Sequence, residues 1–541
     1  MKERLKKIVV MTLVLAMTVG LVACGSSSGG DASSSSGGTD NVVTVGVTDV
    51  LSSVNPLLMD ATEVVKYALS LEFLPLVELN KDVEFEGMLA SDITTEDNQV
   101  FTINLDPDAV WSDGEAVTSE DVLFTFRCWA SPAIGNTSMN ISLIEGTDDS
   151  GYVADDATDV SGIVAVDEKT VQITTKSQMS LDTFQNLYGR YMLILPQHVL
   201  GEVAMEDLAS YDWFNSPTVV SGPYKITDVD LNHYVTYEAN DKYFKGAPKI
   251  GNLAINVYEP SQILSGLQSG EIDVVQQTMA NILQEDYESI RGLENVTSYD
   301  GAPVTTQSMF FNTETISNAK ARQAILCAID RENLVENFLG GNGEVVDGFV
   351  VSKSPYYDSS VTPTAYDLDK AKSLMAEAEA EGFDTSKEYS FYINSGDTTF
   401  SNVATYLVEQ FKELGLTLKI QTVDINTLMT VAGERSFDLM AVQYTYSPVD
   451  VYTDASWLIS ADGWTGFDNE GVLTALAATQ STTDAAAITQ AYKDLDVIMQ
   501  QEVPMINAYT ITALGATSNR VQNATPDVFG TFNNVQEWEL Q

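Results

Sequence analysis

The side chains that most often carry out chemistry in enzymes are scarce in this chain. Its two histidines, His198 and His233, are far apart in sequence and too few for a metal cluster or a paired-histidine zinc motif. The glycine-rich loop at 340–343 lacks the lysine and the serine or threonine of a phosphate-binding loop. With 77 acidic residues, carboxylate pairs are uninformative without geometry. The sequence specifies no catalytic residue, metal site or cofactor, and we expect a protein that is not an enzyme.

One residue near the N-terminus, Cys24, indicates a covalent modification instead. An uncharged run at 8–19 follows four basic residues, Lys2, Arg4, Lys6 and Lys7. The run has the length of a secretory signal and is short for a membrane span, which disfavours the alternative of a transmembrane helix beside an incidental cysteine. Leu-Val-Ala-Cys at 21–24 resembles the lipobox of bacterial lipoproteins. We predict a lipoprotein signal peptide over 1–23 and a lipid on Cys24 that holds the chain to the extracytoplasmic face of the cell membrane.

The segment after Cys24 is expected to be a tether, and the folded body to begin near Val42. Residues 25–38 are nearly all serine and glycine, a composition that buries too little apolar surface to order itself, so we assign 24–41 to this tether. The formal net charge of −50 disfavours nucleic acid as a partner. Such a charge would also speed the approach of cationic small molecules, but a solvated extracellular surface is the favoured explanation of it.

The body alternates strands and helices, which predicts an α/β protein. Strand-like alternation at 388–393 and 418–423 flanks a helical apolar stripe that ends at Gly415, which predicts a parallel βαβ unit. Asp330 and Asp367 are placed to cap further helices. Cys128 and Cys327 lie in apolar contexts on separate predicted helices; we interpret them as buried thiols, with a disulfide between them left open.

A stretch around Trp111 combines several readable features. A strand at 99–105 precedes the tight turn at Asp113-Gly114, and Thr118 can cap the next helix with Asp121 reaching back. The strand, the Trp-x-Asp-Gly turn and the Thr-x-Glu-Asp-Val helix start resemble the hallmark of family 5 solute-binding proteins, the peptide and nickel receptors of ABC importers.

The resemblance continues, in order, along nearly all of the chain that follows the tether. The matching segments are Ser-Gly-Pro-Tyr-Lys-Ile at 221–226, the Asn-x-x-Tyr-x-x-Gly-x-Pro loop at 240–250, Gln-Ser-Gly-Glu-Ile-Asp-Val at 268–274, Phe-Asn-Thr at 311–313, Ala-Arg-Gln-Ala and Ala-Ile-Asp-Arg within 321–331, the Asp-x-x-Lys-Ala helix at 367–376 and Glu-Val-Pro-Met-Ile at 502–506. Any single motif is weak, whereas seven in the correct order are not plausibly chance.

The resemblance implies a class C periplasmic-binding-protein-like fold of three lobes. Lobe I would comprise 42–84, 191–303 and the C-terminal return at 506–541; lobe II would be 85–190 and lobe III 304–505. A hinged cleft between lobes I and III would hold the ligand, and closure would be read by a permease. The implied function is a lipid-anchored, monomeric receptor that captures a small ligand, with a peptide as the leading choice, and delivers it to an ABC transporter permease.

The resemblance also implies which residues line the cleft. One segment is the loop at 49–58, from which we select Asn55. The other is the aromatic segment at 444–457, in which Tyr444 takes the usual tryptophan place and Ser447 the place of the aspartate that holds a peptide amine. Either a small gap moves Asp450 into that role, or the anchor is absent and the ligand offers no free amine. The predicted ligand-binding residues are Asn55, Tyr444, Tyr446, Ser447, Asp450 and Trp457.

Other functions remain open at this point. Aromatic faces suit sugar rings as well as peptide side chains, so a receptor for an oligosaccharide or another small solute is the alternative within the same fold. A nickel or haem-linked role is less favoured because His198 and His233 are the only histidines. A surface enzyme or sensor that has kept the fold is the third hypothesis.

Overall fold

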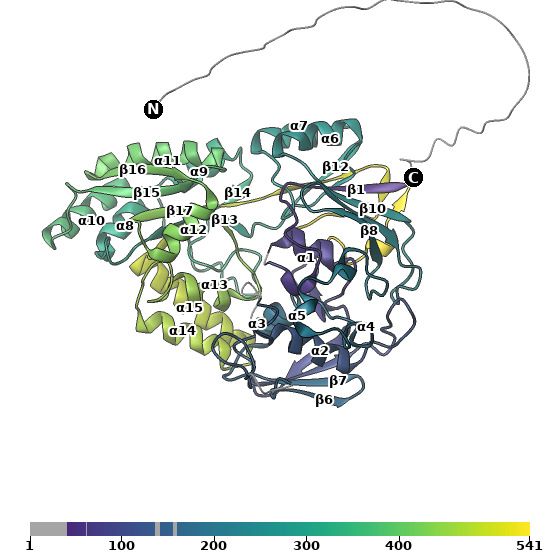
Figure 1. The fold of residues 1–541 in the computed structure, drawn as a ribbon. Coiled ribbons are helices and arrows are strands. Elements are labelled where there is room, and N and C mark those ends of the chain that lie inside the picture. The colour runs from purple at the N-terminus through teal and green to yellow at the C-terminus, as the bar shows by residue number, and fades with distance from the viewer. Residues whose placement is uncertain (1–40, 61, 136–140, 155–158) are drawn as a thin grey trace, which may run out of the picture. The chain divides into compact units, whose positions relative to one another are not determined.

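The computed structural model describes residues 41–60, 62–135, 141–154 and 159–541. The predicted signal peptide, the lipidation site Cys24 and nearly all of the predicted tether lie outside these residues. Residues 41–541 make up one unit, in which helices and strands alternate around three large sheets (Figure 1). This arrangement confirms the predicted α/β class.

Sheet I has seven strands in the order β12-β19-β11-β1-β10-β9-β8. They are β1 (Val42–Val47), β8 (Tyr224–Asp230), β9 (Tyr234–Ala239), β10 (Asn252–Val257), β11 (Val274–Val275), β12 (Val296–Asp300) and β19 (Leu514–Ser518). The central strand β1 is parallel to both β10 and β11. Its valines at 43, 45 and 47 are fully buried. Helices α1 (Glu63–Ser70), α6 (Ile263–Ser269) and α7 (Tyr287–Arg291) belong to this part of the chain.

Sheet II is antiparallel and has the order β4-β5-β7-β6. Its strands are β4 (Ala90–Thr95), β5 (Val100–Leu105), β6 (Ile163–Asp167) and β7 (Thr170–Thr174), and nearby helices are α2 (Ser119–Trp129), α3 (Leu181–Phe184), α4 (Gln197–Leu200) and α5 (Met205–Leu208). Thr118 and Asp121 form the predicted capping box of α2. Trp111 is fully buried, and its indole N–H donates to Asp121 Oδ2 at 3.3 Å. The motif around Trp111 therefore holds α2 in place.

Sheet III has six strands in the order β14-β18-β13-β17-β15-β16. They are β13 (Thr305–Phe311), β14 (Gly343–Glu344), β15 (Glu388–Asn394), β16 (Thr417–Val423), β17 (Leu439–Thr445) and β18 (Met505–Ile511). Strands β15 and β16 are parallel and joined by α11 (Thr398–Phe411), which confirms the predicted βαβ unit. The other helices are α8 (Ala319–Cys327), α9 (Arg331–Phe338), α10 (Leu368–Ala380), α12 (Ile425–Glu434), α13 (Val451–Leu458), α14 (Glu470–Gln480) and α15 (Ala485–Glu502). Asp330 and Asp367 cap α9 and α10 as predicted.

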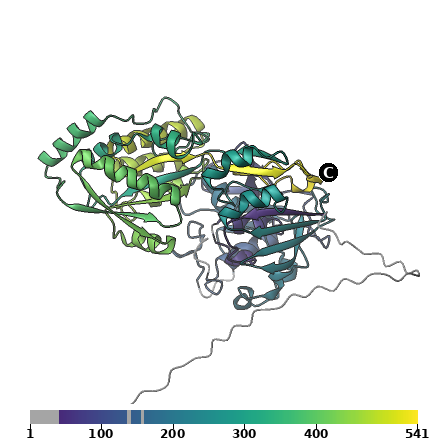
Figure 2. The same cartoon turned by 90° about the horizontal axis from the view of Figure 1, so that it is seen from above.

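The chain crosses between sheets I and III at two places that lie side by side. The first crossing, 301–304, joins β12 to β13, and the second, 512–513, joins β18 to β19. The Gly301 N–H donates to the carbonyl of Ala513 at 2.8 Å, so the two crossings are bonded to each other. Figure 2 shows the green elements of sheet III on one side and the purple and teal elements of sheet I on the other. Strand β18 belongs to sheet III, so the chain passes from sheet III to sheet I after Ile511; the predicted boundaries of the lobes stay predictions.

Two further features complete the fold. Cys128 on α2 and Cys327 on α8 are buried and unpaired, which confirms the prediction of buried thiols and excludes the disulfide between them. Within the described ranges, no helix combines the length and the apolar character needed to cross a bilayer.

Candidate ligand-binding cavity

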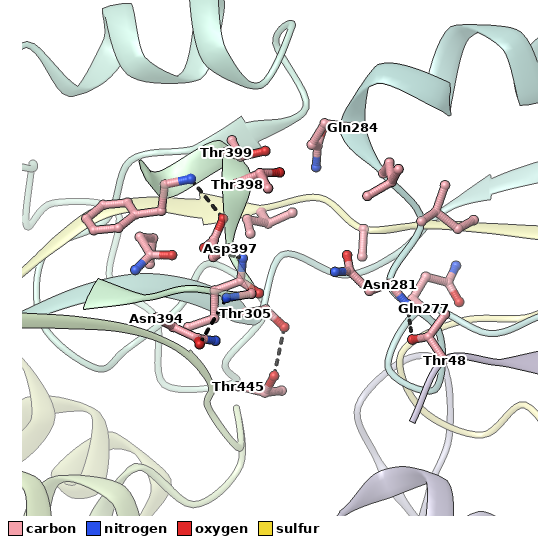
Figure 3. A pocket seen from close by; sticks show the side chains of 18 of the residues that line it. Thr48, Gln277, Asn281, Gln284, Thr305, Asn394, Asp397, Thr398, Thr399 and Thr445 are labelled. Carbon is pink, nitrogen blue, oxygen red and sulfur yellow. Dashed lines mark hydrogen bonds between the residues drawn. The ribbon is translucent and has the colours of Figure 1, made fainter. Parts of the chain in front are cut away.

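A cavity of about 380 Å³ lies where strand ends of sheets I and III face each other (Figure 3). On the sheet I side, Thr48 follows β1 and Gln277 follows β11. On the sheet III side, Asn394 ends β15 and Thr445 ends β17. These four strands each have a parallel neighbour, and the carboxyl ends of parallel strands are where α/β proteins form ligand sites. The cavity therefore occupies the position that this fold class favours for binding.

The sheet III wall contains a row of polar side chains. Gln307 of β13 is paired with Gln443 of β17 on one side and Tyr509 of β18 on the other, and all three line the cavity. Gln443 Nε2 donates to Asp397 Oδ2 at 3.1 Å, while Asp397 Oδ1 accepts from the Phe400 N–H at 2.8 Å and caps α11. Asp397 is thus held by both the sheet and the helix.

The sheet I wall is built from the loops after β1 and β11. The Thr48 hydroxyl accepts a hydrogen bond of 2.8 Å from the Asn281 N–H. Gln277 Nε2 donates to the Tyr299 carbonyl at 3.2 Å and the Pro526 carbonyl at 3.1 Å. A Cβ at Gly515 would lie 2.5 Å from Gln277 Nε2, so only glycine leaves space for this amide. The position of the Gln277 side chain in this wall therefore depends on the presence of glycine at 515.

The charges at the cavity are acidic. Asp49 and Asp397 are among its lining residues, and the described residues place no lysine, arginine or histidine there. The Asp49 side chain is solvent-exposed, yet its pKa is raised. The larger cause is that the surrounding protein reduces the hydration of the carboxylate, and the second is the negative charge of Asp60. Burial also raises the pKa of Asp397. The remaining polar lining consists of amides and hydroxyls, which suits neutral or cationic solutes and disfavours anions.

The predicted aromatic residues lie together, but on the other face of sheet III. Side chains alternate along a strand, so Tyr444 points away from the cavity that Gln443 and Thr445 line. The Tyr444 ring lies 5.2 Å from that of Tyr446 and 6.1 Å from that of Trp457. Tyr446 is buried, whereas Trp457 is 40% exposed. None of the six predicted residues lines the cavity.

Asp450 is fully buried and its hydrogen bonds go to the protein. Its carboxylate accepts from the hydroxyls of Thr183 at 2.8 Å and Thr453 at 2.7 Å and from Asn186 Nδ2 at 3.0 Å. It also caps α13, and burial raises its pKa. In this structure Asp450 joins α13 to the segment around α3, and its predicted role as the anchor of a ligand amine stays a prediction.

Asp454 is a residue that the sequence analysis missed. It lies one turn after Asp450 on α13, and it accepts hydrogen bonds from the Tyr444 hydroxyl at 2.9 Å and the Ser447 N–H at 3.1 Å. Burial, followed by the charge of Asp450, raises the pKa of Asp454 to about 7. The i, i+4 spacing from Asp450 could have suggested it, since such residues share a helix face.

Asn55 has a local structural role. Its Oδ1 accepts from the Leu57 N–H at 3.0 Å, and its Nδ2 donates to the Leu208 carbonyl at 2.9 Å. These bonds fix the loop between β1 and α1 against α5. A contact of Asn55 with ligand remains a prediction.

Comparison with known proteins agrees with this fold. A family model of bacterial extracellular solute-binding proteins, family 5, middle region, matches residues 84–466. The oligopeptide-binding protein AppA of Bacillus subtilis (strain 168) is 24% identical over 473 residues, which cover 83% of this chain and 82% of that protein.

Two solved structures share the architecture over almost their full length. The B. subtilis AppA structure, in complex with a nonapeptide, has a TM-score of 0.72 at 20% identity, covering 92% of this chain and 99% of that one. NikZ from Campylobacter jejuni, in complex with Ni(L-His), has a TM-score of 0.73 at 20% identity, with the same coverage. These likenesses establish the periplasmic-binding-protein-like fold, and the match of the family model over most of the chain shows that it belongs to the family 5 bacterial extracellular solute-binding proteins.

Proposed function

We propose that this chain is a lipid-anchored receptor that captures a peptide outside the cytoplasmic membrane and delivers it to the permease of an ABC transporter. The observation that carries this proposal is the family match across 84–466. The relative in B. subtilis is named an oligopeptide-binding protein, and a solved structure of the same fold holds a nonapeptide. A receptor of this kind works by binding and closure, so we propose no catalytic step for it and a monomeric state.

For peptide capture we propose the aromatic segment, with the predicted residues in two roles. Trp457 offers exposed ring surface and is the proposed direct contact. The Tyr444 ring lies 6.1 Å from that of Trp457, and Tyr444 and Ser447 share Asp454 as a hydrogen-bond acceptor. Tyr446, Asp450 and Asn55 are buried and would act by holding the surrounding segments.

The ligand class can be tested by thermal shift followed by titration calorimetry against peptides, oligosaccharides and chelated nickel. A ligand at 100 times its Kd stabilises the folded state by about 2.7 kcal/mol, so a true ligand raises Tm. We expect a shift with peptides. A shift with sugars alone would replace the peptide by an oligosaccharide, the alternative that the amide and hydroxyl lining of the cavity favours. Turnover of any bound compound would instead revive the surface-enzyme hypothesis.

The proposed anchor can be tested independently of the ligand. We expect the full chain, expressed with its own signal, to be found in the membrane fraction and to carry the mass of a lipid on Cys24. The Cys24→Ala variant is expected in the soluble fraction with ligand binding intact, because Cys24 precedes the folded body. Equal membrane association of both forms would contradict the assignment of Cys24.

A further inference from the structure

The part of the chain beside sheet II touches the helices of sheet III through a set of buried polar contacts, which we call the polar seam. The seam consists of Asn98 and the segment 180–186 on one side and of Tyr356, Asp450 and Gln480 on the other. The Ser180 N–H donates to Gln480 Oε1 at 2.9 Å, and Asn98 Nδ2 donates to the Gln480 carbonyl at 2.9 Å. The Tyr356 hydroxyl donates to Asp182 Oδ2. Two segments that are far apart in the chain are thus held together by hydrogen bonds.

The seam joins two bodies that are built on different hydrophobic cores. Val45 of sheet I and Phe101 of sheet II belong to one core, so these two sheets form one body. Met309 of sheet III belongs to a separate core, which makes sheet III the second body. A third cluster contains Leu79 and Val304 and joins the bodies where the chain crosses. Contacts between parts of one chain that are polar, as the seam is, separate more readily than an apolar core because water can replace the lost partners.

Two carboxyl groups meet in the seam from opposite bodies. Asp182 lies on the sheet II side and Asp450 on the sheet III side. Burial raises the pKa of Asp182; the hydrogen bond from Tyr356 opposes this rise, and the charge of Asp450 adds to it. Burial likewise raises the pKa of Asp450. Neither carboxyl group has a lysine, arginine or histidine among the described residues that offsets these effects.

A basic group lies close to the seam, but its charge is already paired. Arg190 Nη1 donates to Asn186 Oδ1 at 3.1 Å, and Arg190 Nε lies 2.6 Å from Glu78 Oε1. The other titratable groups that face Asp182 and Asp450 are Asp454, Tyr356, Tyr452 and Tyr492. Loss of both protons would therefore leave two negative charges in a buried contact without a positive charge of their own, which costs free energy.

We infer that the polar seam is a pH-sensitive latch, which holds the two bodies together while Asp182 or Asp450 keeps a proton and loosens once both are ionised. In a separated form both carboxyl groups would be hydrated and would ionise at about pH 4. The stabilisation of the closed form is then fully present below about pH 4 and is lost as the pH rises through the higher pKa values of the closed form. The inference goes beyond the proposed function, because it rests on contacts within the protein and holds for any cargo.

The test is hydrogen–deuterium exchange of the full chain at pH 5 and pH 8, without ligand and with correction for the intrinsic exchange rate at each pH. The Ser180 N–H reports on the seam, because its acceptor Gln480 Oε1 lies on the other body. The Leu195 N–H is the matched control, since it also donates to a side-chain oxygen at 2.9 Å, that of Thr125, within the first body. We expect the protection of Ser180 to fall at least about tenfold from pH 5 to pH 8, the effect of one unit of difference in pKa between the two forms. The protection of Leu195 should change much less.

A variant assigns the effect to the seam. Asp182→Asn removes one charge and keeps an acceptor for the Tyr356 hydroxyl, so the protection of Ser180 at pH 8 should stay close to its value at pH 5. Asp424→Asn, which changes an exposed cap of α12, should behave as the parent protein does.

Three results would overturn the inference: no loss of protection at Ser180, an equal loss at Ser180 and Leu195, or a loss at Ser180 that persists in Asp182→Asn. Poor folding of the variant would show as low protection of Leu195 at both pH values, and the comparison within the parent protein would then decide. Because no ligand is present, a failure to bind peptide would count only against the proposed function.

Discussion

The Thr183 hydroxyl donates a 2.8 Å hydrogen bond to Asp450 Oδ1, joining two residues that are 267 positions apart in the chain. The bond ties the first turn of α13 to α3, so part of sheet III's helical layer is fixed to the segment next to sheet II. A second bond of the same carboxylate, from Asn186, strengthens this link. Substitution of Asp450 can therefore be used to measure its contribution to fold stability separately from its contribution to ligand affinity.

The Asp450→Ala variant is expected to lower the free energy of unfolding by about 1–3 kcal/mol, since it removes a helix cap and leaves the buried donors of Thr183 and Asn186 unpaired. Urea denaturation measures this. Asp484→Ala, which removes an exposed cap of α15, is the matched control and should cost less. If Asp450 also anchors a ligand amine, calorimetry with a free-amine peptide will show a loss of well over tenfold. An unchanged unfolding transition would contradict the structural role.

The stability contributed by Asp454 should depend on pH. Its pKa of about 7 in the folded protein exceeds the unfolded value of about 3.9, so the folded state retains a proton that the unfolded chain releases. The free energy of unfolding that depends on Asp454 consequently falls as the pH rises from about 4 to about 7. The groups beside Asp454 are Asp450 and the Tyr444 hydroxyl.

The Asp454→Asn variant removes this titration. Its free energy of unfolding relative to the parent protein should increase between about pH 4 and pH 7 and level off above that range. Urea melts at several pH values test this, with Asp484→Asn as an exposed control. A difference that stays constant with pH would show that Asp454 does not take up a proton in the folded state.

Gly222 belongs to the Gly-Pro-Tyr motif, and the structure requires glycine there because no side chain would fit. A Cβ at this position would lie 2.3 Å from the Leu71 carbonyl oxygen, which cannot move as a flexible side chain would. Gly222→Ala is expected to destabilise the fold by about 1–3 kcal/mol. Gly251→Ala is the matched control, since nothing lies within 4 Å of its added Cβ. Thermal unfolding of both variants measures the difference, and equal Tm values would refute the steric argument.

We expect Trp457 to contribute to peptide affinity and to contribute little to the stability of the fold. Its ring is 40% exposed and lies 4.8 Å from the Trp464 ring. Truncating an aromatic side chain at the centre of a binding surface commonly costs 2 kcal/mol or more, so Trp457→Ala should weaken peptide affinity by about thirtyfold. Val164→Ala, an exposed apolar change on β6, provides the comparison. Calorimetry that finds the same affinity for both would remove Trp457 from the site.

Local features of this fold could be predicted from the sequence because they depend on neighbouring residues. The parallel pair β15 and β16, the capping box of α2 and the caps of α9 and α10 follow from periodicity and turn chemistry within short windows. The buried state of Cys128 and Cys327 followed in the same way from their apolar surroundings.

The cavity could not be predicted in this way, because its walls combine segments that tertiary structure alone brings together. Gln277 and Asp397 have no sequence signal that links them, and two of the partners of Asp450, Thr183 and Asn186, lie 267 and 264 positions away from it. Alternation shows that Gln443 and Tyr444 face opposite ways, yet which face meets another sheet depends on the whole chain. The sequence therefore directed attention to the aromatic face, and the structure added the polar one.

The two bonded crossings at 301–304 and 512–513 have a mechanical consequence. Two adjacent crossings joined by a hydrogen bond would bend readily about one axis and resist twisting, because twisting would stretch the Gly301–Ala513 bond. The parts of the chain built on sheets I and III would then move relative to each other mainly by rotation about one axis. A permease that senses this angle would need to distinguish only two values of one coordinate, whatever the shape of the cargo.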